Sequence, residues 1–191
     1  MGVPQPKNNI KLRHAIQLLM CSITYEKETY LTLKALAEKA SGVVKVALNY
    51  VTNETAGHER TLNAILHHWF DVEVSDRNGD EYCSESMREG LVKLRNLRKE
   101  IEKSNVKEFD NSLMRHYLSI LSGMESMYAE EVMNKELLET ATLLVSSAMG
   151  STDNPESKLS LLKELLLDIS MDEEGHERIL RETLKFVSAN T

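Results

Sequence analysis

Two segments of the sequence place a histidine among acidic residues in nearly the same order. Residues 54–62 read ETAGHERTL, and residues 172–180 read DEEGHERIL. Both belong to helical patterns in which apolar residues recur every three or four positions, and each histidine falls in the apolar row. Glu173 precedes His176 by three residues, so both side chains share one helix face. Because carboxylate oxygens and imidazole nitrogens bind divalent metals, we expect His58, Glu173 and His176 to be ligands.

Glu26 interrupts an apolar row in the same way, in the helix predicted for residues 8–40. An unpaired carboxylate in such a row costs several kcal/mol or takes up a proton. A divalent cation offsets that cost for several carboxylates at once. We therefore expect Glu26 to point into the interior, toward the same ion.

A further carboxylate is expected from the helix predicted for residues 112–149, and neighbouring residues compete for the role. Glu131 shares its helical row with Lys135, whose positive charge would stand one turn from the ion. Glu130 lies in a row without a lysine and is slightly favoured over Glu131. Glu125 is the third choice.

The remaining sequence predicts how these helices are arranged. Only 3 Pro and 8 Gly occur in 191 residues, which favours long helices over an all-β fold. We infer a duplicated helix hairpin, because the two GHER segments occupy matching positions in two helix pairs. The chain 1–191 is expected to form one all-α domain. Its parts are a helix hairpin over 8–70, a connector over 71–111 that contains a helix at about 85–104, and a second hairpin over 112–188.

Composition excludes several classes of protein. The formal charge of −7 argues against binding to nucleic acid. No apolar stretch approaches the roughly 20 residues that span a bilayer, and no signal peptide is evident, so we expect no membrane segment. Cys21 and Cys83 are too few for a disulfide framework or a four-thiolate metal site, and they suit a reducing compartment. A cytoplasmic protein is expected.

These residues together resemble the ferritin-like superfamily, and within it the rubrerythrin-like branch of di-iron carboxylate proteins. Such proteins take one Glu from each of two helices and Glu-x-x-His from each of the other two. The stretch around Glu26, with Leu33 seven residues later, is similar to their first helix. The resemblance implies a four-helix bundle that binds one or two Fe or Mn ions and an oxidoreductase activity toward dioxygen or peroxide. The implied metal ligands are Glu26, His58, Glu130 or Glu131, Glu173 and His176.

The chain departs from that family at one ligand. Thr55 stands three residues before His58, where the family has a Glu, and Glu54 beside it is the candidate substitute ligand. An asymmetric dinuclear site, a single metal and a decayed site all stay open. The alternative function is a helical scaffold or interaction module with a degenerate site that has no redox role.

Two expectations about partners follow from the same resemblance. The sequence has no Cys-x-x-Cys pair, so it lacks the rubredoxin domain of full rubrerythrins, and electrons would come from a separate partner. Relatives often dimerise along a helix pair, so a homodimer is expected by analogy.

Overall fold

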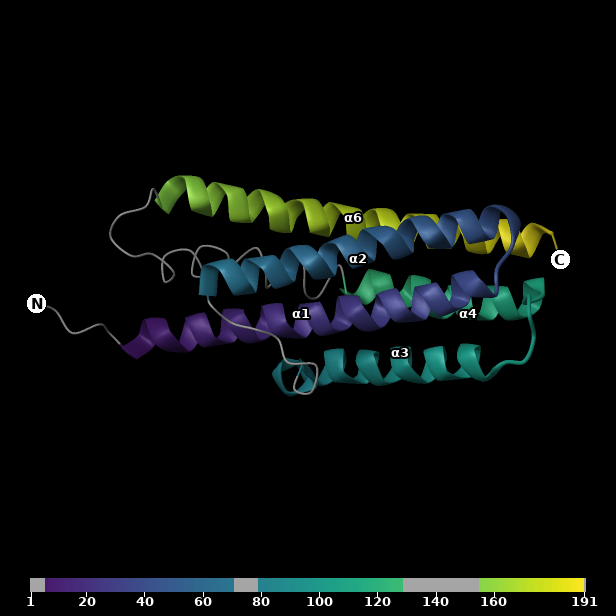
Figure 1. Cartoon of the computed structure of the whole chain (residues 1–191), viewed down its shortest axis with the longest axis horizontal. Coiled ribbons are helices and arrows are strands. Elements are labelled where there is room, and N and C mark those ends of the chain that lie inside the picture. The colour runs from purple at the N-terminus through teal and green to yellow at the C-terminus, as the bar shows by residue number, and fades with distance from the viewer. Residues whose placement is uncertain (1–5, 71–78, 129–154, 191) are drawn as a thin grey trace, which may run out of the picture.

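A computed structural model describes residues 6–70, 79–128 and 155–190 (Figure 1), and every regular element within these ranges is a helix. The all-α class predicted from the sequence is therefore confirmed for this part of the chain. The elements are α1 (Pro6–Glu38), α2 (Gly42–Phe70), the short 3₁₀ helix η1 (Gly79–Tyr82), α3 (Glu85–Lys103), α4 (Asn111–Tyr128) and α6 (Pro155–Ala189).

α1 and α2 form an antiparallel hairpin whose turn depends on a glycine. α1 ends at Glu38, and α2 begins at Gly42, which has a φ of +54°. This left-handed conformation carries little strain only in a residue without a Cβ atom. The two helices pack along their length, so residues of α1 and α2 that lie far apart in sequence share one interior (Figure 1).

The connector carries the chain back along the bundle through α3, which lies beside α1 (Figure 1). Its end is fastened to the turn between α1 and α2. The backbone N–H of Phe109 donates to the carbonyl of Lys39 at 2.9 Å, and Lys39 Nζ donates to the carbonyls of Ser104 and Val106. α4 therefore starts at the end of the bundle where α1 stops, and it runs parallel to α2.

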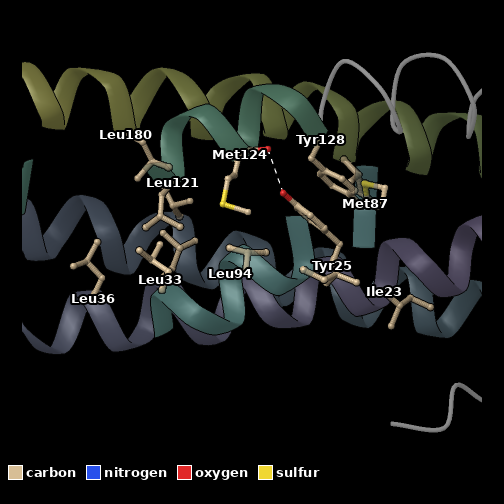
Figure 2. Close-up of a cluster of buried hydrophobic side chains, with 14 of the residues drawn as sticks. Ile23, Tyr25, Leu33, Leu36, Met87, Leu94, Leu121, Met124, Tyr128 and Leu180 are labelled. Carbon is tan, nitrogen blue, oxygen red and sulfur yellow. Dashed lines mark hydrogen bonds between the residues drawn. The ribbon is translucent and has the colours of Figure 1, made fainter. Parts of the chain in front are cut away.

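α4 and α6 form the second antiparallel pair, and α6 also contacts α2. Leucines from α1, α3, α4 and α6 meet in the core, as Figure 2 shows for Leu33, Leu94, Leu121 and Leu180. α1 reaches α4 through Tyr25, whose hydroxyl donates to the carbonyl of Met124 at 3.4 Å. The Tyr25 ring stacks on Tyr128 with centroids 4.5 Å apart. These contacts fix how far α1 and α4 are shifted along their axes.

Cys21 of α1 is joined by a disulfide to Cys83, which follows η1. This corrects the expectation of two free thiols suited to a reducing compartment, because disulfides persist mainly in oxidising ones. The sequence could not show that two cysteines 62 positions apart become neighbours when α3 folds back on α1. None of the described helices combines the length and apolar composition needed to cross a lipid bilayer.

Candidate metal centre

Three buried residues from α2 and α6 form the centre of the site. His58, Glu173 and His176 each direct a ligand atom into a group whose members all lie within 4.8 Å of one another. Nδ1 of His58 lies 2.8 Å from Oε1 of Glu173, and Nδ1 of His176 lies 3.5 Å from that same oxygen. The two imidazole rings stack with centroids 5.3 Å apart. The two GHER segments thus come to the same depth in the bundle.

Glu26 brings a carboxylate from α1 to this cluster. Its side chain is buried, and Oε1 lies 3.9 Å from Nδ1 of His58. α1 positions it through the same apolar row that the sequence revealed, with Leu19 and Leu33 fully buried on either side along the helix. The structure therefore brings Glu26, His58, Glu173 and His176 together.

α4 contributes Glu125, which the sequence ranked only third. Glu125 is 2% exposed, and it lies near enough to Glu173 for the charge of Glu173 to add to the rise that burial causes in the pKa of its carboxyl group. The favoured candidates, Glu130 and Glu131, lie outside the described residues. A signal for Glu125 was present, because Leu118, Leu121, Glu125 and Tyr128 follow at spacings of three and four residues on one buried face. The sequence did not predict how far α4 is shifted along α6, and so it did not show which turn of α4 lies beside Glu173.

Several polar atoms at this point have no partner in good hydrogen-bond geometry among the described residues, although some of them lie close to one another. They are both ring nitrogens of His176, Oε1 of Glu26, Oε1 of Glu125 and the hydroxyl of Tyr128. Buried polar atoms are almost always paired in folded proteins, so a cluster of orphans needs an explanation. A bound cation supplies one, since it accepts lone pairs from carboxylate oxygens and imidazole nitrogens together.

Two of the carboxyl groups favour the protonated form. Burial raises the pKa of Glu26 well above its ordinary value, and the charge of Glu173 adds to the shift, while the neighbouring Tyr128 hydroxyl opposes it. Burial also raises the pKa of Glu125, again with a contribution from Glu173. Burial therefore shifts both groups toward the protonated form, relative to an exposed carboxyl group.

Glu173 and His58 form a charged pair in the same cluster. Burial would favour neutral Glu173, but contacts with His176 and then His58 dominate and hold its pKa far below the usual range. Burial would likewise lower the pKa of His58, yet its bond to Glu173 and its contact with Asp172 raise it. Nε2 of His58 lies 3.3 Å from Oδ2 of Asp172. Since carboxylates only accept, both ring nitrogens of His58 carry protons in this arrangement.

The position expected to hold a bridging Glu on α2 offers no ligand. Thr55 is 1% exposed, and its Oγ1 donates to the carbonyl of Val51 at 2.9 Å within its own helix. Glu54, the candidate substitute, is only half-buried and does not belong to the cluster of His58, Glu173 and His176. The site is therefore asymmetric, with a carboxylate three residues before the histidine on α6 alone.

The donor set decides what this arrangement can do chemically. Three carboxylates suit hard cations, and two imidazoles add the nitrogen donors common in sites for Fe and Mn. His58, Glu173 and His176 could thus hold a metal ion, and its identity as Fe or Mn stays a prediction. No protein-family model, curated protein or solved structure matches the chain, so its function is inferred from the residues and geometry of this site.

Proposed function

We propose that the chain is a ferritin-like metal protein of the rubrerythrin-like branch, which binds Fe or Mn and acts on dioxygen or peroxide. The observation that carries this proposal is the convergence of buried acidic and imidazole side chains from four helices, with polar atoms left unpaired where they meet. Two antiparallel helix pairs and a lengthwise return through α3 support the ferritin-like arrangement. The proposed ligands are Glu26, His58, Glu125, Glu173 and His176.

The bound ion would supply the redox chemistry. The chain's own residues would orient the ligands and exclude water from the site. Burial favours the protonated forms of Glu26 and Glu125, and any proton on these carboxyl groups would leave when they become ligands. Nδ1 of His58 also gives up its proton, while Nε2–H stays directed at Asp172 and keeps the ring oriented. The buried side chains around the site exclude bulk water, which limits side reactions.

Metal analysis of the full chain tests the proposal. Protein purified without a histidine tag and reconstituted anaerobically with Fe(II) or Mn(II) is expected to retain the metal after gel filtration. Glu173→Gln is expected to lose it, because the substitution removes the charge that both histidines face. Glu174→Gln is the matched control, since Glu174 is the exposed neighbour on the same helix. Retention of no metal by the wild-type chain would refute the proposal.

A scaffold without redox chemistry is the second candidate function, and Thr55 favours it because one expected ligand is missing. The two functions predict different results when both members of the buried charged pair are replaced, as in Glu173→Leu combined with His58→Leu. In a scaffold this double change exchanges a costly buried ion pair for apolar packing and leaves the melting temperature unchanged or raised, whereas in a metal protein it abolishes binding. A melting temperature that chelators leave unchanged would favour the scaffold.

Three further expectations belong to the same proposal: a separate electron-transfer partner, a homodimer and a cytoplasmic location. The disulfide between Cys21 and Cys83 argues against the cytoplasmic location, because such bonds are typical of oxidising compartments, and it therefore gives a direct test. Labelling of thiols in freshly lysed cells is expected to find Cys21 and Cys83 reduced if the compartment is reducing. Protection of both cysteines from the label would contradict a cytoplasmic location. Sedimentation equilibrium of the metal-loaded chain tests the homodimer.

A further inference from the structure

We infer that the site holds a single metal ion, and that Thr55 is the residue that excludes a second. This inference rests on the proposed function and specifies how many ions that function uses. The observations that carry it are the stacked pair of histidines, the internal repeat and the hydrogen bond of Thr55.

The repeat makes Thr55 and Glu173 equivalent positions. Each stands three residues before the histidine of a GHER segment. Those histidines, His58 and His176, stack at one depth with an interplanar angle of 25°. Thr55 is as fully buried as Glu173, with 1% of each residue exposed. A carboxylate at position 55 would therefore complete a second half-site that mirrors the one on α6.

Thr55 cannot take that part itself. Its hydroxyl is used within α2, where Oγ1 donates to the carbonyl of Val51. A threonine side chain is also two carbons shorter than glutamate and carries no charge, so it neither reaches as far nor compensates a cation. Glu54 directly precedes the position, and Glu59 follows it one helical turn later, near enough for its charge to act on Glu26. Both are partly exposed, and neither joins the cluster of His58, Glu173 and His176.

Charge balance leads to the same count. The described part of the site contains three buried carboxylates, on Glu26, Glu125 and Glu173. One divalent ion leaves a single negative charge, and one trivalent ion leaves none. Two divalent ions leave an excess of one positive charge. Two trivalent ions leave an excess of three positive charges. Because uncompensated buried charge is costly, the carboxylates within the described part of the site match one ion better than two.

Metal titration of the full chain, stripped with a chelator, tests the count. Mn(II) is added anaerobically, and bound metal per chain is measured by elemental analysis and by the electron paramagnetic resonance signal of the protein. We expect one Mn(II) per chain, with the spectrum of an isolated ion. A wild-type chain that binds two ions with a spin-coupled spectrum overturns the inference and leaves the proposed function standing. A chain that binds none overturns both.

Substitutions at position 55 test the role of the threonine separately. Thr55→Glu is expected to raise the capacity to two ions per chain. A folded Thr55→Glu protein, by circular dichroism, that still binds one ion would overturn the role of Thr55. Thr55→Val keeps the shape of the side chain without the hydroxyl, and it is expected to bind one ion as before. If it binds none, the hydroxyl is a ligand and the inference is wrong. The wild-type and Thr55→Val counts stand even where Thr55→Glu fails to fold.

Discussion

His58 is the residue at which the chemistry of the site is most tightly constrained. One ring nitrogen faces Glu173 in the interior, and the other faces Asp172, whose side chain is 42% exposed. A ring held in this way presents Nδ1 to the interior in a fixed direction. Asp172, which lies outside the cluster, thus orients the ring of His58, which is the proposed ligand inside it.

Asp172→Asn is expected to weaken Mn(II) binding by about 10–100-fold, because an amide does not hold Nε2–H of His58 as firmly as a carboxylate. Competition with a fluorescent chelator measures the affinity. Asp168→Asn, one turn earlier on the exposed face of α6, is the control and should bind as the wild type. Equal affinities for the two variants would show that Asp172 does not position His58.

The protonation states of the site predict an unusual dependence of stability on pH. Glu26, Glu125 and His58 all have a raised pKa in the folded chain. Each therefore stabilises the fold below its unfolded pKa, and that stabilisation is lost as the pH rises through the folded pKa. Glu173 has a lowered pKa, so its contribution is present above the unfolded value of 4.5 and is lost only in stronger acid.

The chelator-treated chain is accordingly expected to melt at a higher temperature near pH 6 than near pH 8. For a chain of this size, each kcal/mol corresponds to about 2–4 °C. The metal-saturated chain should behave in the opposite way, because protons compete with the ion for Glu26, Glu125 and His58. Scanning calorimetry at several pH values measures both. A metal-free melting temperature that rises from pH 6 to pH 8 would contradict the assigned protonation states.

Most of the site could be predicted at this scale, because buried polar residues interrupt apolar rows. Glu26, His58, Glu173 and His176 were found in that way, and the structure brings them together. The choice among Glu125, Glu130 and Glu131 stays a prediction, because several acidic residues of one helix fit helical periodicity equally well and the last two lie outside the described residues. Only the shift of α4 along α6 decides between them, and that shift depends on tertiary contacts such as the stacking of Tyr25 on Tyr128.

At the scale of elements, close packing between α3 and its neighbours depends on Gly90. A Cβ atom built there would lie 3.1 Å from Cε2 of Tyr25 and 3.3 Å from Cε of Met127. The Met127 end can move, but the Tyr25 ring is held by its stack on Tyr128 and its bond to Met124. The absence of a side chain at position 90 therefore lets α3 approach α1.

Gly90→Ala is expected to destabilise the fold by about 1 kcal/mol. Overpacking typically costs about 1–3 kcal/mol of stability. Alanine inside a helix is more stable than glycine by only about 0.5–1 kcal/mol, so the cost is larger than the gain. Gly123→Ala is the matched control in α4, because no atom lies within 4 Å of the added Cβ. It should stabilise the chain by about 0.5–1 kcal/mol. Urea unfolding measures both, and a stabilising Gly90→Ala would show that Tyr25 is free to move.

The positions of the helices in the sequence were largely predictable. Which helices pack against one another was harder to predict. The hairpin predicted over 8–70 agrees with α1 and α2, the helix predicted at about 85–104 agrees with α3, and the end predicted for the second hairpin at 188 agrees with the end of α6. Long apolar periodicity, few prolines and a glycine at the first turn carry that information. The helix predicted for 112–149 is described only as far as Tyr128. The position of α3 against α1 was not predicted, because periodicity shows that a helix has an apolar face without showing what covers it.

At the scale of the whole molecule, two different devices would hold the helices together. The disulfide between Cys21 and Cys83 fastens the connector to α1, and it closes a loop with a sequence separation of 62. The proposed ion would join α1, α2, α4 and α6 through their buried ligands. Cys21 and Glu26 lie five positions apart on α1, about 7.5 Å along the helix axis, and they share no partner among the described contacts.

The two devices are therefore expected to stabilise the fold independently. In the chain-entropy model, a loop of this length is worth about 4 kcal/mol, so Cys21→Ser combined with Cys83→Ser should lower the free energy of unfolding by roughly 2–4 kcal/mol. The number of Mn(II) ions bound should not change, because apolar packing around Leu33 and the Tyr25–Tyr128 stack still set the position of α1.

Urea unfolding of the wild-type chain and of the serine variant, each with and without metal, gives the four free energies of unfolding that the test needs. Because distant sites contribute additively, the loss caused by the serine substitutions should be the same in both metal states to within about 0.5 kcal/mol. A loss that vanishes when the metal is removed would show that the disulfide acts by positioning Glu26, and that the connector belongs to the metal centre.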